Sequence, residues 1–181
     1  MVVINIQNPE ADPKAVGLVK VVDDSITQHW RALFPATITV HVADQILATV
    51  PELAQFWAVQ DLPENYREGI QVACPEYGDD DATLWVHFDH NSVMSAPEYY
   101  FKKEVYAALG QLLWFSSVRL QELLYAQAPW LNSGNQAAGY VAFRDTFSRF
   151  FLNPEWLQDK KPDAWSVIAA IDKELARLPA A

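Results

Sequence analysis

The stretch "YYFKKEVYAALGQLLW", residues 99–114, decides how this sequence folds. Its apolar residues recur at helical spacing, which predicts a long amphipathic helix. Ser95 is a preferred N-cap residue, and Glu98 three residues later would complete a capping box, so we expect the helix to run from about Ser95 to about Tyr125. Gly110 in its interior costs about 1 kcal/mol relative to Ala. That cost favours the close approach of another backbone, or a tight helix crossing, at Gly110.

Strands and helices alternate before this helix. β-Branched and alternating residues mark the strands, and apolar residues at helical spacing mark the helices. Asp12 can cap the first helix, Pro13 suits its first position, and Pro51 interrupts the second helix. The predicted elements are a strand at 2–7, a helix at 12–33, a strand at 37–42, a helix at 44–60, a loop-rich stretch at 61–81 with a candidate strand at 70–74, and a strand at 82–90.

The C-terminal part is predicted to be helical. After residue 127 we expect a loop at 128–139, a helix at 140–152, a turn or short helix at 153–162, and a last helix at 164–178 capped by Asp163. No repeat or linker divides the chain. The whole chain, 1–181, is therefore predicted to be one α+β domain, with a small mixed sheet, helices packed on it and a helical C-terminal part.

Composition excludes several classes of function. The formal net charge is -10, which argues against nucleic acid and anionic membrane surfaces as partners. No run of 18 apolar residues is present, and the N-terminus lacks the basic region of a signal peptide, so we expect a cytoplasmic location. The lone Cys74 excludes an intramolecular disulfide and a cysteine-based zinc site.

The central helix carries a motif with altered residues. The segment "KEVYAALGQLL", residues 103–113, looks like "HEVGHALGHLL", in which two His on one helix face bind zinc and the Glu activates the metal-bound water. The sequence resembles a degenerate zincin-like metallopeptidase domain, nearest to the catalytic domain of the anthrax lethal factor family. The resemblance implies that Glu104 corresponds to the general base. It places Lys103 and Ala107 at the positions of the two His ligands.

A second segment is similar to the same family. "VAFRDTF", residues 141–147, resembles E-F-F-A-E-A-F, whose first Glu is the third zinc ligand. Phe143 and Phe147 are retained, Asp145 stands in for the second Glu, and Val141 stands at the ligand position. The resemblance covers roughly residues 80–175.

The replaced ligands imply an inactive domain. A protonated Lys103 has no lone pair for a metal, and Ala107 and Val141 offer only methyl groups. We therefore expect no metal, no cofactor and no peptidase activity, and a remaining role in binding or regulating a protein or peptide in the former substrate cleft. The expected cleft residues are Tyr100, Tyr140, Arg144 and Asp145. A cation should hold the vestigial base Glu104 in its charged form, and the candidates are Lys103, Arg144 and Arg149.

Three alternatives remain open at this point. Residues 99–114 can be an ordinary amphipathic helix with a solvated Glu104, and Asp145 with Arg149 an ordinary i,i+4 pair. The chain can instead be a hydrolase with a rebuilt active site, using Glu104 as general acid/base with help from Lys103 or a nearby His. It can also be a structural or regulatory subunit whose cleft is filled. His87 and His90 would lie on opposite faces of a strand at 82–90, which argues against chelation.

Overall fold

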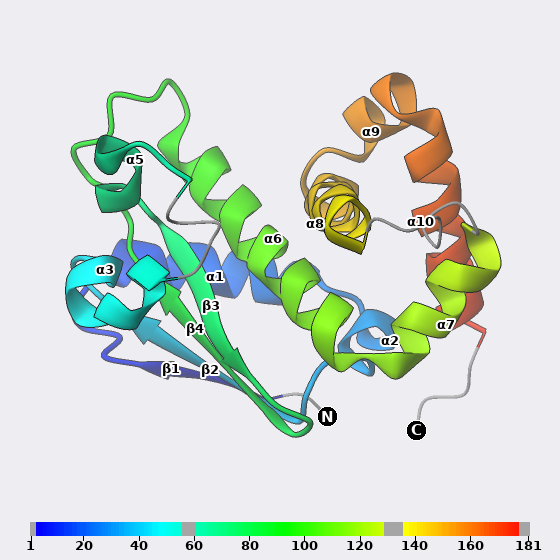
Figure 1. Cartoon of the computed structure of the whole chain (residues 1–181), viewed down its shortest axis with the longest axis horizontal. Coiled ribbons are helices and arrows are strands. Elements are labelled where there is room, and N and C mark those ends of the chain that lie inside the picture. The colour runs from blue at the N-terminus through cyan, green and yellow to red at the C-terminus, as the bar shows by residue number, and fades with distance from the viewer. Residues whose placement is uncertain (1–2, 56–60, 129–135, 178–181) are drawn as a thin grey trace.

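A four-stranded mixed sheet forms one layer of the molecule (Figure 1). The computed structural model describes residues 3–55, 61–128 and 136–177. Within these residues the strands are β1 (Val3–Gln7), β2 (Thr37–Val42), β3 (Val72–Tyr77) and β4 (Asp81–Val86). Their order is β1-β2-β4-β3, with β1, β2 and β4 parallel and β3 antiparallel beside β4. Parallel neighbours need a crossover, and a helix supplies it between β1 and β2.

Helices α1 (Pro13–Ser25) and α6 (Pro97–Ser116) pack against one face of the sheet (Figure 1). Successive side chains of a strand point to opposite faces, so buried and partly exposed residues alternate along β2 and β4. Val40 of β2 joins Val19 of α1 and Val105 of α6 in one hydrophobic core. This core fixes α6 over the sheet.

The C-terminal helices form a second group beside α6, on the side away from the sheet (Figure 1). They are α7 (Val118–Gln127), α8 (Gln136–Leu152), α9 (Pro154–Lys160) and α10 (Pro162–Leu175). The short helix α2 (Gln28–Arg31) joins this group, because its fully buried Trp30 meets the rings of Phe147 and Phe151 edge-on. The remaining short helical segments are α3 (Ile46–Thr49), η1 (Pro51–Gln55) and α5 (Glu64–Glu68).

This architecture confirms the predicted fold class. The protein is α+β, with a small mixed sheet, helices packed on it and a helical C-terminal part. Among the described residues, no helix combines the length and the apolar character needed to cross a membrane.

The predicted capping box at the start of the central helix is wrong. Helix α6 begins at Pro97, and its N-cap is Ala96, without a side-chain hydrogen bond. Proline suits the first helical position, where its fixed φ and missing N–H cost little, so Ser95 falls outside the helix. The Glu98 carboxylate instead pairs with Lys14 of α1, 2.8 Å away.

The predicted end of this helix, at about Tyr125, is also wrong. The helix ends at Ser116, and Ser117 has extended backbone angles (φ -100°, ψ 99°). The Ser117 hydroxyl accepts a hydrogen bond from the backbone N–H of Leu120 at 3.2 Å and so caps α7. The Gln121 side chain donates to the Trp114 carbonyl at 2.6 Å, which satisfies a carbonyl left free by the break.

The helix predicted at 12–33 is likewise divided, into α1 and α2. The chain is extended at Ile26 and Thr27 between them. The Arg31 side chain donates to the carbonyls of Asp23 and Ile26, so carbonyls at the break find a partner. The spacing of apolar residues along the sequence therefore did not reveal this break between α1 and α2.

Other boundaries shift by a few residues. The predicted helix at 44–60 is represented by α3 and η1, and residues 56–60 lie outside the described residues, as do 129–135 of the predicted loop. The strand expected at 82–90 is β4 (Asp81–Val86), and the candidate strand at 70–74 is β3 (Val72–Tyr77). The stretch 61–81 also contains α5, and 153–162 contains α9. The helix expected at 140–152 begins at Gln136, and the last helix begins at Pro162 with Lys161, instead of Asp163, as its N-cap.

Candidate functional site

The crossing of α6 and α8 positions the candidate site. A Cβ atom placed on Gly110 would lie 3.2 Å from Cβ of Phe147, closer than an ordinary van der Waals contact. Phe147 is fully buried, and its ring meets Trp30 at 5.3 Å and Phe151 at 5.0 Å. Gly110 therefore serves a tight helix crossing against a side chain, which was one of its two expected roles.

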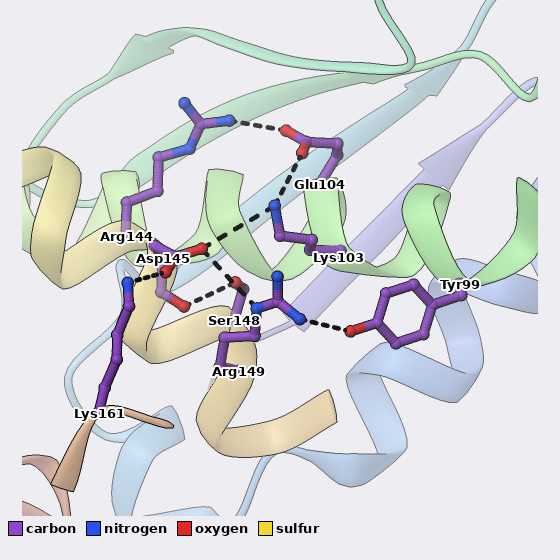
Figure 2. Close-up of polar contacts among 8 residues, drawn as sticks. All are labelled: Tyr99, Lys103, Glu104, Arg144, Asp145, Ser148, Arg149 and Lys161. Carbon is purple, nitrogen blue, oxygen red and sulfur yellow. Dashed lines mark hydrogen bonds and ion pairs between the residues drawn. The ribbon is translucent and has the colours of Figure 1, made fainter. Parts of the chain in front are cut away.

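Glu104 faces α8 across this crossing (Figure 2). The guanidinium of Arg144 donates a hydrogen bond to its carboxylate at 2.7 Å, and the ammonium of Lys103 lies 3.9 Å from its other oxygen. Two of the three expected cations are thus beside Glu104. The third, Arg149, contacts Asp145 and Tyr99 instead.

Three cationic side chains from different elements surround the Asp145 carboxylate (Figure 2). Lys161 donates a hydrogen bond to one oxygen at 2.9 Å, while Lys103 and Arg149 lie 3.9 and 3.8 Å from the other. Burial raises the pKa of Asp145, but the hydrogen bond and charge of Lys161, with the charges of Lys103 and Arg149, lower that pKa below its usual value. The carboxylate is therefore held in its charged form.

Arg149 is fixed on two further sides. It donates a hydrogen bond to the Tyr99 hydroxyl at 2.8 Å, and its guanidinium lies over the Trp156 ring, 4.3 Å from the ring centroid. A guanidinium stacks well on an aromatic face. Arg149 thus links α6, α8 and α9 at one point.

We call six of these residues the charged cluster. The described side chains that form it are the cations Lys103, Arg144, Arg149 and Lys161 and the anions Glu104 and Asp145. Four positive and two negative charges give a local excess of 4 - 2 = +2. The chain as a whole carries -10, so the cluster is a cationic spot on an acidic protein.

The other predicted site residues are placed differently. The Tyr140 hydroxyl donates to the Gln111 side chain at 2.7 Å, and burial raises its pKa while the charge of Arg144 opposes that rise. Tyr100 is partly exposed and meets Tyr99 edge-on. Ala107 is only 4% exposed, whereas Val141 is 51% exposed. The structure therefore brings Lys103, Glu104, Arg144 and Asp145 into contact. Tyr100 lies about one turn before Lys103 and Glu104 on α6, and Val141 lies one turn before Asp145 on α8.

Sequence reasoning missed Tyr99 and Lys161. Lys161 lies 16 positions from Asp145 and Tyr99 lies 50 positions from Arg149, so no local spacing signals either contact. The pair of Asp145 and Arg149 was visible from its i,i+4 spacing, although the 3.8 Å separation makes it an ion pair without a hydrogen bond.

The residues at the matched ligand positions do not fit zinc. Zinc is bound by imidazole, thiolate or carboxylate, whereas the three positions hold an ammonium group and two aliphatic side chains. In the part of the chain that the structure describes, no three His, Cys, Asp or Glu side chains are grouped as a metal site would need. His87 and His90 follow β4 and have separate partners, the Ala43 carbonyl and the Asp12 carboxylate.

The expected resemblance to a metallopeptidase rests on two short segments, residues 103–113 and 141–147. No protein-family model matches the chain, and no curated protein or solved structure is significantly similar to it.

Proposed function

We propose that this chain is a metal-free, catalytically inactive metallopeptidase-like domain, related to the zincins of the lethal factor type, that binds a protein or peptide. One observation carries the proposal. Glu104, at the position of the general base, is hydrogen-bonded to Arg144 at 2.7 Å and lies 3.9 Å from the ammonium of Lys103. Two cations thus surround the carboxylate that would otherwise act on a metal-bound water.

This pairing removes the features that hydrolysis needs. The Arg144 hydrogen bond occupies one of the two Glu104 oxygens, and the Lys103 ammonium lies 3.9 Å from the other. The positive charge of Lys103 repels a divalent cation, and its ammonium has no lone pair to offer one. A water molecule at this site would have no suitable ligands to hold an activating metal ion, and the carboxylate that would accept its proton is already paired with cations.

Exposed rings beside the cluster support a binding role. Tyr77 of β3 stacks on Phe115 of α6 at 5.2 Å, and Phe115 meets Tyr140 of α8 at 5.3 Å. Tyr77 and Phe115 are 42% and 49% exposed. This aromatic row, Tyr77–Phe115–Tyr140, adjoins the charged cluster because Tyr140 and Arg144 lie one turn apart on α8. Aromatic and arginine side chains are the ones that contribute most at protein interfaces.

Metal content and hydrolysis test the inactive part of the proposal. Elemental analysis after dialysis should give well under one zinc per chain, and a general protein substrate such as casein should stay uncleaved. Stoichiometric zinc would instead favour a hydrolase with a rebuilt site. So would cleavage that Glu104→Gln abolishes and Glu122→Gln, in the exposed Arg119–Glu122 pair of α7, leaves intact.

Peptide selection tests the binding part. Peptides selected from a random displayed library on the wild-type chain should lose binding to the Phe115→Ala variant. Tyr125→Ala is the matched control, since Tyr125 is a similarly exposed ring on α7, outside the aromatic row. Equal binding of the selected peptides to both variants would show that the aromatic row is not the binding surface.

A further inference from the structure

We infer that the charged cluster binds a carboxylate of the bound peptide, with Lys103 and Arg149 as the donors. This inference rests on the proposed peptide-binding function and names the chemistry that the site selects. The carboxylate belongs either to the C-terminus of the peptide or to an acidic side chain, and both present the same planar pair of oxygens.

The two carboxylates within the cluster are already neutralised. Glu104 accepts a hydrogen bond from Arg144 at 2.7 Å, and Asp145 accepts one from Lys161 at 2.9 Å. These two pairs account for one cation each. Lys103 and Arg149 remain as the surplus positive charge of the cluster.

The surplus cations have unused donors. The ammonium of Lys103 has three N–H groups, yet its nearest carboxylate oxygens lie 3.9 Å away, too far for a hydrogen bond. The Nε of Arg149 is buried and out of reach of a ligand, but within the described residues only Nη1 of its two terminal nitrogens makes a hydrogen bond, to the Tyr99 hydroxyl, and the side chain is 21% exposed. Lys103 and the terminal guanidinium of Arg149 are therefore the groups that an incoming carboxylate can reach.

The side chains are also held in place for a ligand. Arg149 is fixed by Tyr99 and Trp156, and Lys103 is only 23% exposed and lies between two carboxylates. Donors that are already ordered lose little conformational entropy when they bind an acceptor. Charge-assisted hydrogen bonds of this kind are about twice as strong as neutral ones.

A peptide carboxylate is the ligand that the surroundings favour. A carboxylate brings a single negative charge, which Lys103 and Arg149 can offset. Inorganic phosphate brings close to two negative charges, which the surplus of +2 can also offset, so phosphate is the competing anion that the test includes. The aromatic row beside the cluster gives the rest of a peptide a surface on which to lie.

Four small probes separate these possibilities. The first is acetyl-Ala-Ala-Ala with a free C-terminus, and the second is acetyl-Ala-Glu-Ala amide. The third is the neutral acetyl-Ala-Gln-Ala amide, and the fourth is inorganic phosphate. Binding to the whole chain is followed in proton–nitrogen correlation spectra through the Arg149 Nε–H and the Trp156 indole N–H signals. We expect saturable shifts with at least one of the two carboxylate peptides, and the responding peptide identifies the source of the carboxylate.

Two lysine variants provide the decisive comparison. Lys103→Met should weaken carboxylate binding about tenfold, the factor that corresponds to about 1.4 kcal/mol. Lys102→Met removes the same charge from the adjacent position of α6 and should leave binding unchanged. The charge of Lys102 helps to lower the pKa of Glu98, which lies outside the charged cluster. Lys103→Arg, which keeps the charge and the donors, should retain most of the binding and shows that the helix tolerates a change at this position.

Several results would overturn the inference. They are equal shifts with the neutral glutamine peptide, tighter binding of phosphate than of both carboxylate peptides, or unchanged affinity in the Lys103→Met variant. The short probes depend little on the aromatic row. Failure of every carboxylate probe, with selected library peptides still bound through Phe115, would therefore reject the carboxylate site alone. Carboxylate binding that depends on Lys103, without any selected peptide, would reject only the peptide-binding function.

Discussion

Replacing Gly110 with Ala tests the helix crossing on which the candidate site depends. In an open helix position, Gly→Ala is stabilising by up to about 1 kcal/mol, because Ala has the higher helix propensity. At Gly110 the new Cβ would lie 3.2 Å from Cβ and Cδ1 of Phe147 and 3.3 Å from its Cγ. The clash must be relieved by moving α8, because Phe147 is fully buried against Trp30 and Phe151.

The expected magnitude follows from these opposing effects. Extra volume in a well-packed core costs about 1–3 kcal/mol. With about 2 kcal/mol for the clash and up to about 1 kcal/mol of propensity gain, Gly110→Ala should lower the free energy of unfolding by about 1 kcal/mol. Gly17 on α1 provides the matched control, since a Cβ there meets nothing within 4 Å. Gly17→Ala should raise the free energy of unfolding by up to about 1 kcal/mol.

Urea unfolding followed by circular dichroism measures both variants. The two unfolding free energies should differ by about 2 kcal/mol at an unchanged m-value, which corresponds to about 4–8 °C in Tm for a chain of this size. If Gly110→Ala stabilised the protein as much as Gly17→Ala, α6 and α8 would not cross at Phe147. The register that brings Arg144 to Glu104 would then be wrong as well, and with it the charged cluster.

Three other predictions concern the ligand positions, Asp145 and Cys74. The triple variant Lys103→His, Ala107→His, Val141→Glu should bind zinc in calorimetry yet cleave no general protein substrate, because groups that orient the ligands contribute about 10–100-fold and oxyanion donors about 10²–10³-fold. A folded triple variant without zinc affinity would refute the matched positions. The folded-state pKa of Asp145 is lowered, so its stabilising effect is complete above the unfolded value of about 3.9 and disappears as the pH falls through the folded value. Asp145→Asn should therefore reduce stability at neutral pH and leave it unchanged in strong acid, and an equal loss at every pH would contradict this. Burial raises the pKa of Cys74 to about 12, so a disulfide reagent should modify it far more slowly in the native protein than in denaturing urea.

The sequence by itself determined the types of most secondary-structure elements. β-Branched alternation marked β2 and β4, and Asp12 with Pro13 marked the start of α1, where the Asp12 carboxylate accepts from the N–H groups of Lys14 and Ala15. These signals lie within a few residues of one another, so they act before any tertiary contact forms. The order of these elements was enough to predict an α+β fold with a helical C-terminal part.

Only the tertiary structure decided where helices break and which charges meet. The Ser95–Glu98 capping box had the right spacing, but the Glu98 carboxylate pairs with Lys14 on another helix instead. Asp145 was visible as a partner of Arg149, yet its hydrogen bond comes from Lys161, a residue brought near by the turn into α10. The physical reason is that local propensity reads only neighbouring residues, whereas the partner of a long charged side chain depends on the angle and register at which two helices pack. At the α6–α8 crossing, that register is set by Gly110 against Phe147.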